Sequence, residues 1–113
     1  MVYERGQLMK EKKIPDGVDK IIVAICKDYP RRKKALEHGR AHGQTKRYFL
    51  RLNNAIETAL DEECDEWVRV DMLTDIAENR GFRKTRSCYV TQRSYYDSKR
   101  RVKHALARKL HLL

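Results

Sequence analysis

The last predicted helix of the chain, which follows Thr91, carries long polar side chains suited to contacting the edges of base pairs. Arginine can donate two hydrogen bonds to guanine, glutamine can pair with adenine, and tyrosine can contact a phosphate or a thymine methyl group. At 100° per residue, most of these side chains lie opposite an apolar stripe that includes Tyr95, Val102 and Leu106. The candidates for base reading are Arg93, Tyr96 and Arg100, with Gln92 close by.

Basic side chains around this helix are candidates for contacts with phosphates. Residues 81–113 contain ten basic and one acidic side chain, whereas residues 61–80 contain two basic and eight acidic ones, within a chain of formal net charge +10. A basic segment attracts a polyanion such as DNA, RNA or an acidic membrane surface. A solvated helix face that only promotes solubility remains an alternative explanation. The phosphate candidates are Arg83, Lys84, Arg86, Lys99 and Lys103.

Two other residues fall on the same outward face of this helix, Asp97 and His104. A carboxylate there would repel DNA, unless it accepts a hydrogen bond from a cytosine amine or from a neighbouring arginine. Asp97 is therefore the one unfavourable residue on the predicted DNA-binding face.

Motifs of an enzyme or of a metal site are absent from the sequence. It has no phosphate-binding glycine loop, no nucleophile elbow and no HExxH motif. The carboxylates between Asp61 and Glu66 stand at a predicted helix junction, where they are best explained as solvated helix ends. His38 and His42 could share a metal on a helix, but glycines interrupt that stretch and no CxxC pair accompanies it. We therefore expect no catalysis, no cofactor and no metal.

Length and composition favour one helical domain. The 113 residues can bury one modest core, and five glycines and two prolines are too few for a turn-rich β fold. No apolar run approaches the roughly 18 residues of a membrane span, and residues 1–7 lack the apolar stretch of a signal peptide. Three widely spaced cysteines, Cys26, Cys64 and Cys88, indicate no disulfide framework. These features predict a cytoplasmic protein without membrane contact, whose cysteines are small buried or half-buried groups.

The elements that must position the candidate residues are predicted to be helices. Asp16 is expected to cap the first, and proline at position 30 to open a second one that ends at His38. A longer helix follows from about Thr45 to Glu63. The next runs from Asp65 to about residue 80 and ends at Gly81 in a left-handed conformation. A basic loop over residues 81–90, in which 88–90 could form a very short strand, leads to a final helix capped by Thr91.

The predicted buried positions follow the helical period. They are Val18, Ile21, Ile22, Ile25, then Tyr48 or Phe49, Leu52, Ile56, Ala59, Leu60, then Trp67, Val68, Met72, Leu73, Ile76, and finally Tyr95, Val102, Ala105, Leu106, Leu110 and Leu113. The fold class that follows is all-α, a four- to five-helix bundle ending in a helix-turn-helix-like unit with a long basic loop. Residues 1–14 are expected to form a flexible tail, 15–64 the N-terminal helices and 65–113 the terminal unit of a single domain. The two helices of that unit are expected to pack through Leu73, Ile76, Val102 and Leu106.

Two segments of the C-terminal half resemble a known group of proteins. One is Asp75–Phe82, and the other runs from Val90 to Arg101 and contains Tyr95-Tyr96 and Lys99-Arg100. They resemble phage-encoded transcriptional regulators of the ArpU/RinA type, which look like the last DNA-binding region of sigma-70 factors. In that group an ISxxTYYxxKR-like segment opens the recognition helix. Here Val90-Thr91 and Ser94 stand at its Ile-Ser and Thr positions.

The upstream segments Lys27–Lys34 and Ile56–Leu60 also look like the helical N-terminal part of such regulators. The resemblance implies sequence-specific binding of double-stranded DNA and control of phage or prophage genes in a bacterial host cell. The loop of residues 81–90 departs from the turn of about 3–4 residues in a standard helix-turn-helix. It could set the recognition helix at an unusual angle or itself hold phosphate.

Two rival functions remain open on the sequence. An RNA-binding or antitermination factor would have the same charge, because charge alone does not separate DNA from RNA. An adaptor that contacts RNA polymerase would use the acidic block 61–80, and this role could coexist with DNA binding. The N-terminal helices could also supply a homodimer contact, since helix-turn-helix proteins often bind as dimers.

Overall fold

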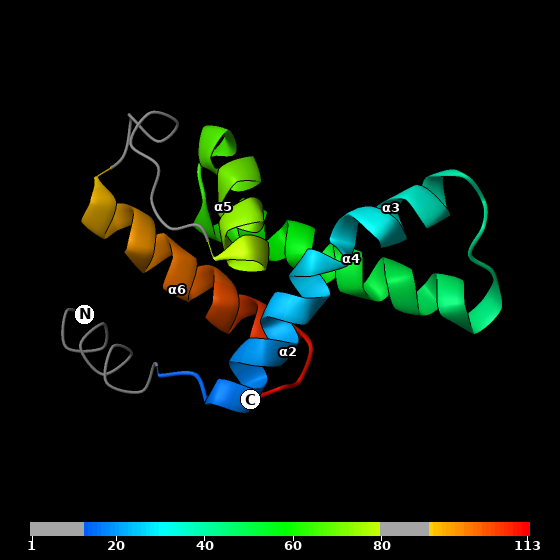
Figure 1. Ribbon diagram of the computed structural model, residues 1–113, viewed down its shortest axis with the longest axis horizontal. Coiled ribbons are helices and arrows are strands. Elements are labelled where there is room, and N and C mark those ends of the chain that lie inside the picture. Colours follow the sequence, from blue (N-terminus) through cyan, green and yellow to red (C-terminus); the bar gives the residue numbers. More distant parts are fainter. Residues whose placement is uncertain (1–12, 80–90) are drawn as a thin grey trace.

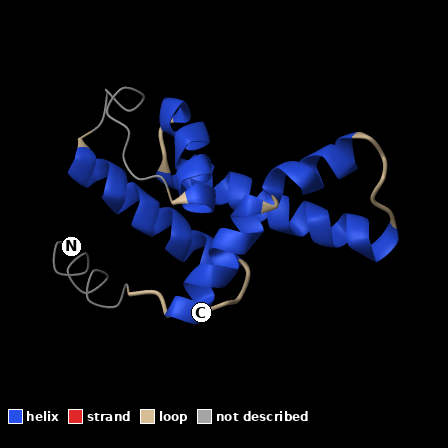
Figure 2. Ribbon diagram, viewed as in Figure 1, coloured by secondary structure: helices blue, strands red, loops and turns tan. Residues whose placement is uncertain are grey.

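The computed structural model describes residues 13–79 and 91–113 of the chain, and these residues form an all-α fold (Figure 2). Five helices lie within the described residues, in line with the predicted class. They are α2 (Asp16–Lys27), α3 (Tyr29–Glu37), α4 (Gly43–Glu63), α5 (Glu66–Glu78) and α6 (Gln92–Lys109). Helix α3 begins at Tyr29, one residue before the predicted Pro30, and α4 begins at Gly43, two residues before the predicted Thr45.

The helices form a core at one end of the molecule and a projecting hairpin at the other. Helix α2 packs closely on α5, the C-terminal part of α4 packs on α6, and α3 folds back beside α4 (Figure 1). We call residues 29–51 the arm, because α3 and the first part of α4 project together from the core. The start of α6 and the tip of the arm lie near opposite ends of the longest dimension, which is 45 Å (Figure 1).

The core combines apolar residues of α2, α4, α5 and α6. Among the predicted positions, those buried are Ile22, Leu52, Ile56, Ala59, Leu60, Val68, Met72, Ile76, Tyr95, Val102, Ala105 and Leu106. The thiols of Cys26 and Cys64 are also buried, as expected, and burial raises the pKa of Cys26 to about 12 and that of Cys64 to about 11. These two cysteines therefore act as apolar groups.

Five predicted positions differ from the structure in their burial, and one of them is Ile21, which is predicted to be buried but is 44% exposed on α2. Of the alternatives Tyr48 and Phe49, Tyr48 is 56% exposed because only α3 covers the arm part of α4, whereas Phe49 is half-buried. Trp67 is 58% exposed in the first turn of α5. The prediction that Leu113 is buried is also wrong, since it lies exposed beyond the end of α6. His104, predicted to face outward, is only 4% exposed. It is buried because α2 and α4 both pack on α6 and enclose more than one stripe of that helix.

Helix ends follow local chemistry, with two corrections. Pro15 rather than Asp16 is the N-cap of α2, and Asp16 is the first helical residue. The left-handed residue that ends α5 is Asn79, with φ 55°, whereas the predicted Gly81 lies outside the described residues. Asparagine is the residue other than glycine that best tolerates this conformation. The predicted cap of α6 is confirmed, because the Ser94 N–H donates to the Thr91 hydroxyl at 3.0 Å.

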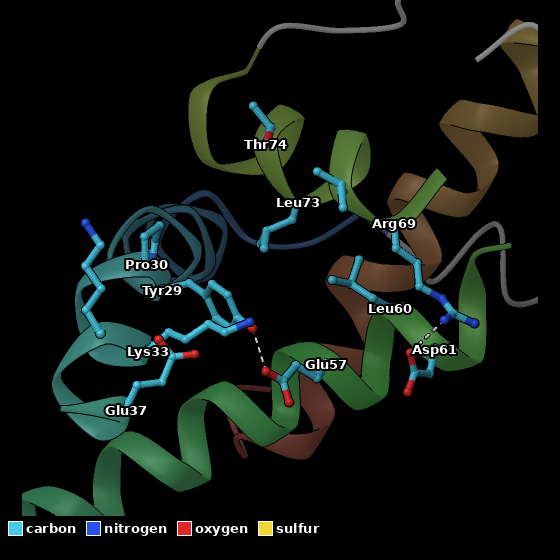
Figure 3. A pocket seen from close by; sticks show the side chains of 12 residues that line it. Tyr29, Pro30, Lys33, Glu37, Glu57, Leu60, Asp61, Arg69, Leu73 and Thr74 are labelled. Atoms are coloured by element: carbon cyan, nitrogen blue, oxygen red, sulfur yellow. Dashed lines mark hydrogen bonds and ion pairs between the residues drawn. The ribbon is translucent and has the colours of Figure 1, made fainter. Parts of the chain in front are cut away.

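The relation between α5 and α6 differs from the expected direct packing. Helix α5 packs mainly on α2, and α6 mainly on α4, although Ile76, Val102 and Leu106 all belong to one core. Leu73 instead lines a pocket with Tyr29, between α3, α4 and α5 (Figure 3). Helix α2 thus takes much of the α5 surface that the sequence assigned to α6.

Several predictions fall on residues outside the described ranges. They concern the tail up to residue 12, the basic loop and short strand over residues 81–90, and Cys88. The phosphate candidates Arg83, Lys84 and Arg86 are in this loop. Within the described ranges, no helix combines the length and apolar character needed to cross a membrane.

Candidate nucleic-acid interface

The first turn of α6 presents two of the base-reading candidates to solvent. Gln92 and Arg93 are both exposed, directly after the Thr91 cap. Arg93 makes no ion pair with any residue that the structure describes. The hydrogen bond from Ser94 to Thr91 fixes the backbone from which both side chains extend. Hence the polar groups of both side chains are accessible to a ligand at the capped N-terminus of α6.

The other two base-reading candidates are half-buried next to α2. Tyr96 stacks edge-on against Tyr95, with ring centroids 5.5 Å apart. Tyr96 and Arg100 line a polar hollow together with Lys13 and Asp19. They are therefore less accessible than the first turn, although both still reach the surface.

Asp97, the carboxylate on the predicted DNA-binding face, is paired with a neighbouring arginine. The Arg100 guanidinium lies 3.4 Å from the Asp97 carboxylate, one helical turn away. The pairing lowers the repulsion that Asp97 would exert on a phosphate, at the cost of part of the Arg100 charge. Arg93 is thus a stronger candidate for base contact than Arg100.

A buried carboxylate joins α5 to α6. Asp75 is 2% exposed and accepts hydrogen bonds from the Tyr95 hydroxyl at 2.8 Å and from the Lys99 ammonium at 3.0 Å. Burial, and then the hydrogen bond to Asp75, raise the pKa of Tyr95 well above its usual value. Lys99, a predicted phosphate contact, has only 12% of its side chain exposed. Its charge is used to hold α6 against α5.

Most other cations of α6 are also paired within the fold. Lys103, a second predicted phosphate contact, lies 2.9 Å from Asp19 of α2. Arg101 and Lys109 pair with Glu63 and Glu62 at the end of α4, each at 3.1 Å. The acidic block 61–80 therefore supplies carboxylates to the basic α6. The formal charge of the C-terminal third overstates what α6 offers to an outside polyanion.

The arm shows the opposite pattern, because most of its cations are exposed to solvent and unpaired within the described residues. Exposed basic residues that make no ion pair with any described residue are Lys34, Arg40, Lys46, Arg47 and Arg51. The arm also contains Arg31, which pairs with Asp28 at 2.7 Å, and Lys33, whose ammonium lies 5.8 Å from the Tyr29 ring centre.

One buried arginine fixes the base of the arm. Arg32 is 3% exposed, and its Nε donates to the Asn53 amide oxygen at 2.7 Å. A second nitrogen donates to the carbonyl of Ile25 at 2.6 Å, and a third lies 3.6 Å from the Asp28 carboxylate. These contacts tie α3 to α2 and α4. The arm is thereby held in one orientation relative to the core.

The pocket between α3, α4 and α5 has polar groups that are already paired (Figure 3). The Tyr29 hydroxyl donates to Glu57, and Arg69 lies 3.2 Å from Asp61. Burial, and then this hydrogen bond, raise the pKa of Tyr29 above its usual value. The pairs tie neighbouring helices together and explain the pocket as a junction in the fold.

His38 and His42 lie at the two ends of the turn between α3 and α4, where both are exposed. The described residues contain no group of three or more histidine, cysteine, aspartate or glutamate side chains arranged to hold a metal ion.

Sequence reasoning missed two features of this surface. The first is the structural role of Asp75 and Arg32, which the sequence could have indicated. Each is a charged residue at a helical position that faces a neighbouring helix. The second is the basic arm, which the sequence could have indicated by eight basic residues and one acidic residue over positions 29–51. No protein-family model, no curated protein and no solved structure matches this chain.

Proposed function

We propose that this chain is a sequence-specific, double-stranded DNA-binding transcriptional regulator of phage or prophage genes. The observation that carries the proposal is the exposed first turn of α6, where Gln92 and Arg93 extend from a capped helix start. A helix N-terminus with such side chains is the part that enters the major groove in helix-turn-helix proteins. In this role α6 is the recognition helix and α5 the preceding helix of the unit.

The phage context and the regulatory role rest on the resemblance to ArpU/RinA-type regulators, so the site of action would be the cytoplasm of a bacterial host. In this proposal Arg93 and Gln92 contact bases, with Tyr96 and Arg100 at the edge of the groove. Lys99 and Lys103 position α6 through Asp75 and Asp19. Arg83, Lys84 and Arg86 keep their assignment as phosphate contacts.

Salt dependence provides the first test of this function. We expect the affinity for a DNA duplex to fall at least about tenfold between about 50 and 200 mM salt, as two or more displaced counterions require. Fluorescence anisotropy of a labelled duplex measures this directly. Absence of binding at low salt, or binding that does not change with salt, would contradict the proposal.

A second arm of the same titration separates DNA from RNA. The deep, narrow major groove of an RNA duplex does not admit a reading helix, so an RNA duplex should compete poorly for the site selected on DNA. Equal or stronger competition by RNA of the same sequence would favour the antitermination alternative.

A further inference from the structure

The arm has a high density of positive charge, most of which makes no ion pair within the described fold. Positions 29–51 contain eight Lys and Arg residues against the single acidic residue Glu37, a formal charge of +7. Arg32 is buried and Arg31 is paired, but the five exposed cations from Lys34 to Arg51 named above make no ion pair with any described residue. Like charges gathered on α3 and the first part of α4 repel one another and raise the local potential. Such a surface is stabilised by a polyanion.

Helix α6 differs from the arm, because most of its cations are paired within the fold. Five of the seven cations between Gln92 and Lys109 lie in ion pairs with carboxylates of the fold. A paired cation offers less attraction to an outside phosphate than an unpaired one. The electrostatic part of binding should therefore come largely from the arm rather than from α6.

We propose that the arm is a second DNA-binding surface, which holds the phosphate backbone of a duplex apart from the site on α6. The inference rests on the proposed function for the nature of the ligand, and it adds a site that the function itself does not require. The contact is with backbone, because its cations are spread over two helices and a turn instead of gathering on one helix start.

The dimensions of the arm fit this role. Arg47 and Arg51 are four residues apart on α4, about 6 Å along the helix axis. This is close to the rise of two base pairs along a duplex axis, at about 3.4 Å each. The arm tip and the start of α6 lie near opposite ends of the 45 Å axis (Figure 1). This length corresponds to about 13 base pairs at about 3.4 Å each. A duplex of about 20 base pairs is thus long enough to meet both sites.

Two matched double variants test the inference. Lys46→Gln with Arg47→Gln removes two exposed cations from the arm, and Lys20→Gln with Arg108→Gln removes two from elsewhere on the surface. Both pairs contain one lysine and one arginine, and none of the four residues makes an ion pair with a described residue. Circular dichroism and thermal melting verify that both variants fold like the wild type.

The measurement is the affinity for a random-sequence duplex of about 20 base pairs as a function of salt. We expect the arm variant to bind about tenfold or more weakly at about 50 mM salt, with a salt slope smaller by about two. The control variant should change less than about threefold. Equal effects of the two variants on the duplex would overturn the arm assignment while leaving the proposed function intact.

Two further results would also overturn it. If the wild type binds no duplex at low salt, the proposed function fails together with this inference. If the wild type binds vesicles of anionic lipid more tightly than the duplex, and only the arm variant loses that binding, the arm belongs to a membrane surface instead.

Discussion

Replacing Asp75 with alanine is expected to destabilise the protein by about 3 kcal/mol or more, because it leaves the Lys99 ammonium without its buried carboxylate. The same change removes the acceptor of the Tyr95 hydroxyl. Both lost contacts join α5 to α6, so the orientation of α6 should loosen as well. Chemical denaturation followed by far-UV circular dichroism measures the loss in the free energy of unfolding.

A double variant shows whether the loss of stability comes from the unpaired charge of Lys99. Asp75→Ala combined with Lys99→Met removes both partners of the ion pair, so the double variant should be more stable than the sum of the single effects predicts. A coupling of about 1 kcal/mol or more is expected. Strictly additive effects would mean that Asp75 and Lys99 do not act as a pair.

Replacing Arg32 with methionine should cost about 2–4 kcal/mol, because the Asn53 amide oxygen and the Ile25 carbonyl lose their donor in a buried place. Methionine keeps much of the arginine stem, so the loss reflects hydrogen bonds more than packing. The free energy of unfolding from urea denaturation provides the measurement.

The adjacent arginine is the control for this prediction. Arg31 pairs with Asp28 on the exposed side of α3, and Arg31→Met should cost less than about 1 kcal/mol. Equal costs at the two positions would show that Arg32 is not the anchor of the arm.

Helical period and capping chemistry were sufficient to predict most of the fold. Thr91 caps α6 as predicted, because its hydroxyl accepts a hydrogen bond from the backbone N–H three residues on, which is a local interaction. Val102 and Leu106 are buried because an apolar stripe must be covered in any arrangement of helices. Which helix covers the stripe depends on contacts far apart in sequence. For this reason the placement of α2 against α5 was not predicted.

The candidate site was harder to predict, because charge pairing depends on tertiary structure. Lys99, Lys103 and Arg93 are all basic residues of the last predicted helix. Of the three, only Arg93 makes no ion pair with a described residue. The carboxylates that pair with the lysines come from α5 and α2, 24 and 84 positions away. A charge count along the sequence therefore favoured α6 and overlooked the arm.

The most direct test of base reading by α6 compares Arg93→Ala with Arg108→Ala, two exposed arginines of the same helix. Each is measured against a duplex site selected from a random pool by the wild type, and against a scrambled duplex. Arg93→Ala should cost about 1–3 kcal/mol on the selected site and much less on the scrambled one. Arg108→Ala should change both equally and slightly. Equal losses on the two duplexes for Arg93→Ala would contradict base reading by α6.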